Sequence, residues 1–214
     1  MNLLWFNWKD IKNPESGGAE VYTHEIAKRL VKRGYSVTLF TSKFKGCKME
    51  EIIDDVKIIR DGGRYTVYQR AKEFYKENSN RFDMVIDEIN TRPFLTPKFA
   101  NRYKIIALIH QLAKEFWFYE TPFPVNLFGR YFLERRWLKN YTDIPTITVS
   151  NSTKKDLERL EFKKIFIVHN GLNVEPLNEV PEKAEKPTII FVGRMKKAKN
   201  LRMQLKHLKL LRRR

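Results

Sequence analysis

Three loops of this 214-residue sequence contain residues that suit contact with an anion, and the first follows an apolar run near the start of the chain. It reads PESGGAE over residues 14–20, with Gly17 and Gly18 adjacent just before an expected helix. Adjacent glycines leave backbone N–H groups uncovered, and a helix start carries partial positive charge, so this loop suits an anion site. A loop that needs glycine only to turn is the alternative, and the motif alone does not decide between them.

The second loop begins with His110, directly after the apolar run IIALI. A histidine at the end of a strand in an α/β sheet can donate a hydrogen bond to a phosphate or a sugar hydroxyl near neutral pH. A packed structural histidine is the alternative, and it is the commoner case when no context is given. No second His, Cys or Asp stands nearby at ligand spacing, so we expect no metal site.

The third loop is GRMKKAKN, residues 193–200, which follows the apolar run TIIFV. Arg194 can contact a diphosphate through two N–H groups, and Lys199 adds a compact positive charge. The alternative is a solvated basic tail, which is the usual meaning of a run of like charges.

The elements that must hold these loops alternate between apolar strands and amphipathic helices. Such an alternation predicts a doubly wound, Rossmann-like parallel α/β sheet, in which ligands bind at the carboxyl ends of the strands. The expected strands are 3–6, 37–40, 56–60, 83–87, 104–110, 145–150 and 165–168, and the expected helices are 18–33, 66–78, 125–141 and 150–160.

Composition divides the chain into three parts. Residues 1–174 contain the alternating elements, residues 175–187 are rich in Pro, Glu and Lys and form an expected linker, and residues 188–214 open with a new strand at 188–193. We therefore expect one complete domain and the start of a second. No apolar run approaches the roughly 20 residues that span a bilayer.

Charge and cysteine content limit the functional class. The formal net charge is +17, to which residues 201–214 contribute six Lys or Arg and no acid. The rest is basic but well mixed, which favours an anionic partner without favouring nucleic acid. A single cysteine, Cys47, excludes an internal disulfide and favours a reducing compartment, so we expect a cytoplasmic protein.

Nine aromatic side chains crowd residues 116–137, and we expect most of them in the core. The alternative is that some of them rest on a membrane surface together with neighbouring arginines. The arginines concerned are Arg130, Arg135 and Arg136.

The sequence resembles glycosyltransferase family four, the group-one glycosyl transferases of GT-B architecture. The matching pieces are GGAEVYTHEIAKRLVKRGYSVTLFTS (17–42), IALIHQ (106–111), PTITVSNSTKKDL (145–157), HNGLN (169–173) and IIFVGRMKKAKN (189–200). The resemblance implies two Rossmann-like domains that face a cleft, the first binding the acceptor and the second the nucleotide sugar. This chain would be the amino-terminal half of that fold, with the second domain truncated.

The resemblance also implies roles for particular residues. Gly17 and Gly18 match the loop against the donor diphosphate, His110 matches the histidine near the donor sugar and its phosphate, and Arg194 and Lys199 match the pair that neutralises the leaving diphosphate. It implies transfer with retained anomeric configuration, without a metal or other cofactor. The implied partners are a nucleotide sugar and a carbohydrate or lipid-linked acceptor. Independently of the resemblance, the membrane alternative given above predicts peripheral contact with an anionic membrane at its inner face, and the mixed charge predicts no nucleic-acid partner.

Some positions depart from the family pattern. Asn151 stands where relatives often carry Glu, and His169 stands where they often carry Pro. The paired-glutamate motif of the second domain is absent, so we expect this chain to be inactive alone. Residues 201–214 lack acids for a helix start, whereas suitable codons shifted by one base read PEDAIKAFK, so we expect a frameshift after Asn200.

Two other functional classes remain as alternatives. A non-catalytic basic α/β module that binds anionic lipid or RNA predicts salt-sensitive binding by the isolated chain. A nicotinamide-dependent dehydrogenase or epimerase is disfavoured because the Gly-x-Gly-x-x-Gly fingerprint is absent.

Overall fold

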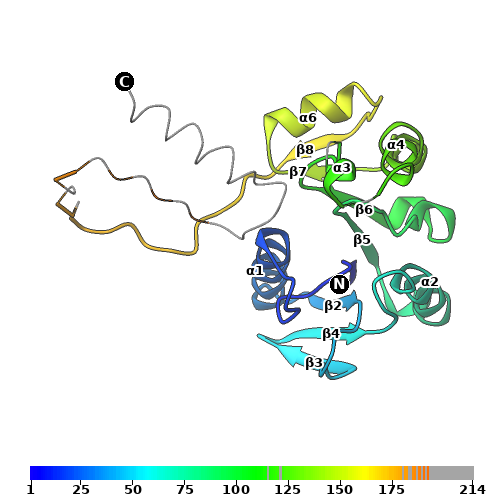
Figure 1. Cartoon of the computed structure of the whole chain (residues 1–214). Coiled ribbons are helices and arrows are strands. Elements are labelled where there is room, and N and C mark those ends of the chain that lie inside the picture. Colours follow the sequence, from blue (N-terminus) through cyan, green and yellow to red (C-terminus); the bar gives the residue numbers. More distant parts are fainter. Residues whose placement is uncertain are drawn as a thin grey trace.

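A computed structural model describes residues 1–114, 116–120, 122–179, 181–182, 185–186, 188, 190 and 192. Eight strands form one sheet in the order β3-β4-β2-β1-β5-β6-β7-β8, parallel throughout except for the antiparallel pair β3 and β4 (Figure 1). The strands are β1 (Asn2–Phe6), β2 (Ser36–Thr41), β3 (Glu50–Ile53), β4 (Val56–Arg60), β5 (Met84–Ile89), β6 (Ile105–Ile109), β7 (Thr146–Thr148) and β8 (Ile165–Ile167). The expected Rossmann-like α/β sheet is confirmed.

The helices differ in length, and one of them is interrupted. They are α1 (Gly18–Lys32), α2 (Val67–Asn78), α3 (Phe116–Glu120), α4 (Val125–Phe128), α5 (Glu134–Leu138) and α6 (Asn151–Glu158), with a π-helical stretch at Gly129–Leu133 and 3-10 turns at Ser79–Arg81, Thr96–Lys98, Arg102–Lys104 and Lys139–Tyr141. Within the described ranges, no helix is long and apolar enough to cross a membrane.

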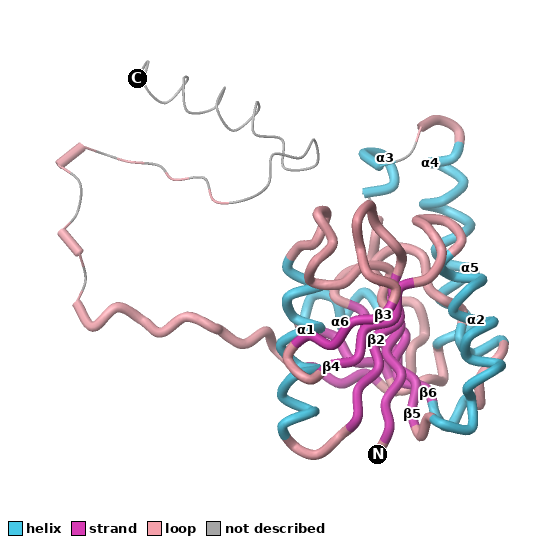
Figure 2. The backbone as a smooth tube through the Cα atoms, turned by 90° about the horizontal axis from the view of Figure 1, so that it is seen from below, coloured by secondary structure: helices cyan, strands magenta, loops and turns pink. Residues whose placement is uncertain are grey.

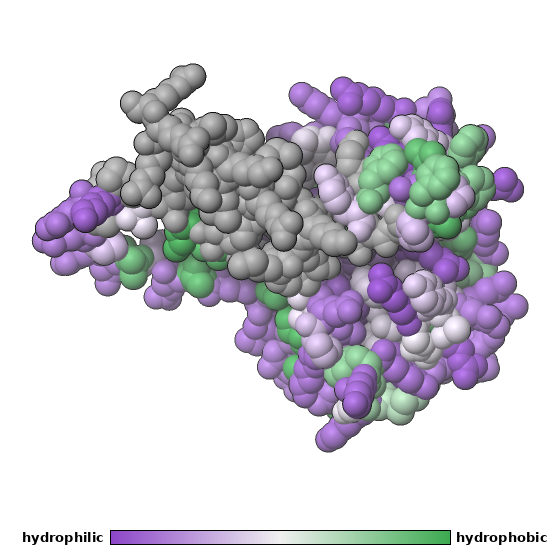
Figure 3. Space-filling view, in the orientation of Figure 1, coloured by the Kyte–Doolittle hydropathy of each residue, from purple (hydrophilic) through white to green (hydrophobic). Residues whose placement is uncertain are grey.

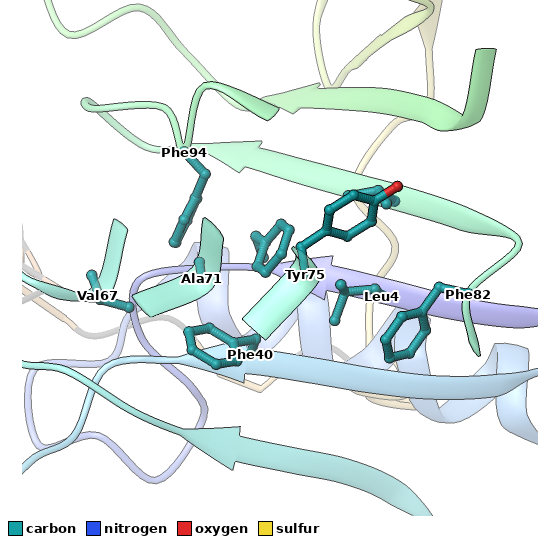
Figure 4. Packing of buried hydrophobic residues seen from close by; sticks show 9 residues of the cluster. Leu4, Phe40, Val67, Ala71, Tyr75, Phe82 and Phe94 are labelled. Carbon is teal, nitrogen blue, oxygen red and sulfur yellow. The ribbon is translucent and has the colours of Figure 1, made fainter. Parts of the chain in front are cut away.

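The sheet is buried on both faces, which explains the continuous apolar runs of its central strands. In β1, Leu4 packs with Ala71 of α2 on one face (Figure 4), and Phe6 belongs to the same cluster. Leu3 and Trp5 pack in the cluster of α1 on the other face. Figure 2 shows α1 on one side of the strands and α2 and α5 on the other. Strands and helices therefore form three layers.

The strand order reverses beside β1, which fixes where a ligand site is expected. The chain passes from β1 to β2 and β4 on one side, then returns to place β5 on the other side of β1. Loops from the carboxyl ends of β1 and β5 diverge at this switch point, and a crevice forms there in open α/β sheets.

Three expectations about the elements need correction or stay open. The single helix expected at 125–141 is instead α4, the π-helical stretch, α5 and a 3-10 turn in succession. Strand β3 was not expected, because its residues Glu50–Ile53 alternate only between exposed and half-buried positions. Of the strand expected at 188–193, residues 188, 190 and 192 are described and lie outside any strand, so the start of a second domain stays a prediction.

The expectation that the aromatic side chains of residues 116–137 lie mostly in the core is wrong. Trp117 is buried, but most of the others are exposed by 40% or more of their surface. The physical reason is that the inner side of this segment is already filled, because the backbone at Gly129 lies against the Trp117 ring so closely that a Cβ there would come within 2.2 Å of it. The exposed side chains are Phe118, Tyr119, Phe123, Phe128, Tyr131 and Phe132.

Candidate functional site

A buried carboxylate, Glu88, lies at the switch point and contacts three surrounding elements. It lies near the carboxyl end of β5 and is 1% exposed. Its Oε2 atom accepts hydrogen bonds from the Trp5 indole, at 2.8 Å, and from the Thr23 hydroxyl of α1. One carboxylate thus links β1, β5 and α1, and its orientation is fixed by both donors.

The other oxygen of Glu88 holds His110, the first residue after β6. Glu88 Oε1 lies 3.2 Å from His110 Nε2, and the imidazole is 15% exposed. The Tyr22 ring meets the imidazole edge-on at 5.0 Å, and the Thr153 hydroxyl of α6 donates to the His110 carbonyl. Since an ionised carboxylate can only accept, Nε2–H donates this hydrogen bond. Nδ1 is then the nitrogen left for another partner, and it has none among the described residues.

The loop after β1 places Gly17 and Gly18 at the amino-terminal end of α1, on the helix that contacts His110. Gly18 begins α1, and Tyr22, which touches His110, follows one helical turn later. The Gly17 N–H is already bound by the Glu20 carboxylate, so it is not free for an anion. The N–H groups of Gly18 and Ala19 make no hydrogen bond among the described residues, and a Cβ at Gly18 would meet nothing within 4 Å.

A buried ion pair fixes the middle of this loop. Asp10 accepts two hydrogen bonds from the Arg60 guanidinium, from Nε at 2.7 Å and from Nη2 at 3.1 Å, and both side chains are fully buried. Arg60 also donates to the Lys48 carbonyl and to Glu51. The end of β4 therefore holds the loop that leads to Gly17.

The positive charge of Lys9, in the loop after β1, is partly compensated by neighbouring groups. Lys9 donates to the Glu15 carbonyl at 2.7 Å and lies 3.4 Å from Glu20. Burial raises the pKa of Tyr22, and the negative charge of Glu88 raises it further, so this hydroxyl keeps its proton beside His110. Within the part of the chain that the structure describes, no group of three or more His, Cys, Asp or Glu side chains is placed to hold a metal ion.

The structure brings together three of the five residues singled out in the sequence, namely Gly17, Gly18 and His110. Arg194 and Lys199 lie outside the described residues, so their role stays a prediction. Sequence reasoning missed Glu88, although one signal was available: DE interrupts the apolar run MVIDEI where the strand approaches its carboxyl end. It missed Trp5 and Thr23 as well, because nothing local shows that they meet Glu88.

A family model described as Glycosyltransferase Family 4 matches residues 16–176 of the chain. The matched range contains Gly17, Gly18, Glu88 and His110. A comparison with curated proteins gives no match.

Two solved structures have a similar fold. Sucrose-phosphate synthase from Thermosynechococcus elongatus superposes with a TM-score of 0.60 at 13% identity, over 80% of this chain and 48% of that chain. A second structure of the same synthase gives a TM-score of 0.54 at 12% identity, over 81% and 91% of the two chains. The chain therefore spans about half the length of the first structure, and the likeness establishes the fold.

Proposed function

Because the chain belongs to Glycosyltransferase Family 4, we propose that it forms the acceptor-side domain of a GT-B enzyme that transfers a sugar from a nucleotide-diphosphate sugar to an acceptor hydroxyl. The observation that carries this proposal is the position of His110. Its Nε2 is held by the buried Glu88, and Nδ1 is left for a ligand beside the open start of α1. A packed histidine with both nitrogens satisfied would not support it.

Different groups are proposed to contact different parts of the donor. The uncovered N–H groups at Gly18 and Ala19, with the dipole of α1, suit a phosphate oxygen of the donor. His110 suits a hydrogen bond to the donor sugar or its phosphate. On the second domain, Arg194 and Lys199 are proposed to neutralise the remaining diphosphate charge, which favours departure of the leaving group.

The proposed reaction is a substitution at the anomeric carbon of the donor sugar. The bond from that carbon to the diphosphate oxygen breaks, and a bond to the acceptor oxygen forms on the same face, so the anomeric configuration is retained. The proton of the acceptor hydroxyl passes to the leaving phosphate. We propose that no metal takes part, because cationic side chains and helix N–H groups supply the positive charge.

The donor side is proposed to come from a second domain that starts near residue 188. The DNA beyond codon 200 tests this part: we expect the frame shifted by one base to continue as PEDAIKAFK and to encode paired glutamates. A confirmed frame after Asn200, together with an alternative frame that does not open into a domain, would contradict it.

The function itself is tested with a panel of nucleotide sugars and a cell extract as the source of acceptor. We expect the two-domain protein to release nucleoside diphosphate with one donor, and we expect the 214-residue chain to release none. A folded two-domain protein that uses no donor would contradict the proposal, and efficient transfer by the 214-residue chain would contradict the need for a second domain. Nuclear magnetic resonance of the product tests retention.

A further inference from the structure

Exposed aromatic side chains gather on one lobe of the domain, formed by α3, α4, the π-helical stretch and α5. Figure 3 shows hydrophobic residues over the place where Figure 1 labels α4. A contiguous apolar patch of this kind marks an interaction surface more often than an ordinary solvated face. We call this surface the aromatic lobe and define it by Phe118, Tyr119, Phe123, Phe128, Tyr131 and Phe132.

The outward direction of these side chains follows from packing on the inner side. Gly129 lies against the Trp117 ring, and Leu138 is buried in the core. The Glu134 carboxylate accepts hydrogen bonds from the Ala113 and Lys114 N–H groups and from the Trp117 indole. With these inner positions filled, the opposite side of the same helical segment faces solvent.

On the outer side, the exposed rings form part of one surface. The rings of Phe128 and Phe132, four residues apart, stack with their centres 5.7 Å apart. Val125 and Leu127, in the same segment, are 49% and 41% exposed. The lobe therefore presents aliphatic as well as aromatic surface to a partner.

The charge beside the aromatic lobe is mainly positive. Residues 122–142 contain four basic residues and a single acid, Glu134, whose side chain is buried. Glu115 and Glu120 precede this stretch in the sequence. Two of the basic residues, Arg130 and Arg135, also line a cleft of about 430 Å³. The same cleft is lined by Asp156, whose charge is paired with Lys114 and Arg159. An apolar surface thus adjoins a positive one.

We propose that the aromatic lobe docks on the surface of a membrane that contains anionic phospholipid. Aromatic and aliphatic side chains enter the boundary between headgroups and acyl chains, while arginines contact the phosphates. This inference does not require that the protein transfers sugar. Its test measures binding alone, so the two proposals can fail separately.

Charge and exposed aliphatic side chains favour a membrane over other occupants. Residues 193–214 carry ten Lys or Arg and no acid, and a second copy has a net charge of +17, so either would meet the lobe with charge of the same sign. Single-stranded RNA is also anionic and stacks on aromatic rings, but the exposed Val125 and Leu127 add nothing to stacking. They suit acyl chains.

The test is sedimentation of the 214-residue chain with vesicles of phosphatidylcholine, with and without phosphatidylglycerol. We expect binding mainly to the anionic vesicles. Replacing Phe128→Ser together with Phe132→Ser should lower the fraction bound on the order of tenfold, because apolar contact is lost. Replacing Arg135→Ser together with Arg136→Ser should weaken binding to anionic vesicles by a factor on the order of ten or more.

Two control pairs match these changes in kind and number. Tyr103→Ser with Phe166→Ser removes exposed aromatic rings outside the lobe, and Lys72→Ser with Lys76→Ser removes two exposed charges on α2. Both pairs should bind vesicles as the native chain does, and melting temperatures check that every variant is folded. Equal losses in control and lobe variants, equal binding to neutral vesicles, or RNA binding that needs Phe128 and Phe132 and exceeds vesicle binding would each overturn the proposal.

Discussion

Glu88 Oε1 lies 3.2 Å from Nε2 of His110, and the two residues stand 22 positions apart at the ends of adjacent strands. The other oxygen of Glu88 is held by Trp5 and Thr23, which come from β1 and α1. The carboxylate therefore has little freedom to move. Because it is held by β1 and α1 and belongs to β5, these three elements together fix the position of the imidazole ring. We regard Glu88 as the residue that positions His110.

Replacing Glu88→Gln tests this positioning role. The side-chain amide can still accept from Trp5 and Thr23 through its oxygen, but it then turns an NH2 group toward His110 Nε2. The imidazole must move its proton to Nδ1 or turn away. We expect turnover of the two-domain enzyme to fall about 100-fold, with a changed pH profile and a small change in melting temperature. Turnover and pH profile like those of the native enzyme would show that Glu88 only packs.

Replacing Gly18→Val tests phosphate contact at the start of α1. The backbone at Gly18 does not need the left-handed conformation that favours glycine, and a Cβ there meets nothing within 4 Å. We therefore expect an unchanged or slightly higher melting temperature, with a large fall in turnover because the new side chain fills the space that an anion needs. Unchanged turnover in a folded variant would exclude an anion at this position.

The Asp10–Arg60 pair is expected to matter for stability. Replacing Arg60→Met leaves the Asp10 charge buried without its partner, which should lower the free energy of unfolding by about 3–5 kcal/mol. Replacing both residues, Asp10→Leu with Arg60→Met, should cost less than the single change because no charge is left buried. Denaturant titration measures both. A double variant less stable than Arg60→Met would contradict this account.

The buried Asp87 predicts a stability that depends on pH. Burial raises its pKa above the ordinary 3.8, against the opposing effect of hydrogen bonds from Tyr141, Thr96 and Phe94. The folded state then holds the proton more tightly than the unfolded state, so this group stabilises the fold at low pH and the contribution is lost as pH rises through the raised pKa. Asp87→Asn removes this titration. We expect the melting temperature of the variant, relative to that of the native chain, to rise as pH increases above 3.8. A difference between the two melting temperatures that does not change with pH would contradict this.

Local pattern was sufficient to predict most of the fold. The run LLWF in β1 is apolar throughout because both of its faces are buried, and that pattern indicates a central parallel strand. Gly34, with φ at +88°, follows the basic last turn of α1 and marks its end as expected. Both features can be recognised from a few consecutive residues, without knowledge of distant contacts.

Features that depend on distant partners could not be predicted. Glu88 contacts Trp5, 83 residues away in the sequence, and Thr23, 65 residues away, so local helix and strand patterns cannot predict its role. The aromatic lobe was assigned to the core because hydrophobicity predicts burial, whereas Trp117 and Gly129 already fill the inner side of the segment. The role of Glu88 and the exposure of the aromatic lobe both depend on residues that only the folded chain brings close.

The turnover of the His110→Ala variant shows whether this imidazole takes part in sugar transfer. His24→Ala is the matched control, since His24 is a buried histidine of α1 whose Nε2 binds Asp54 at 2.7 Å. In the two-domain protein, we expect His110→Ala to lower sugar transfer by about 100-fold or more with little change in melting temperature. We expect His24→Ala to lower the melting temperature while the folded fraction keeps its turnover. Native turnover in folded His110→Ala, or a loss explained by unfolding, would contradict the account.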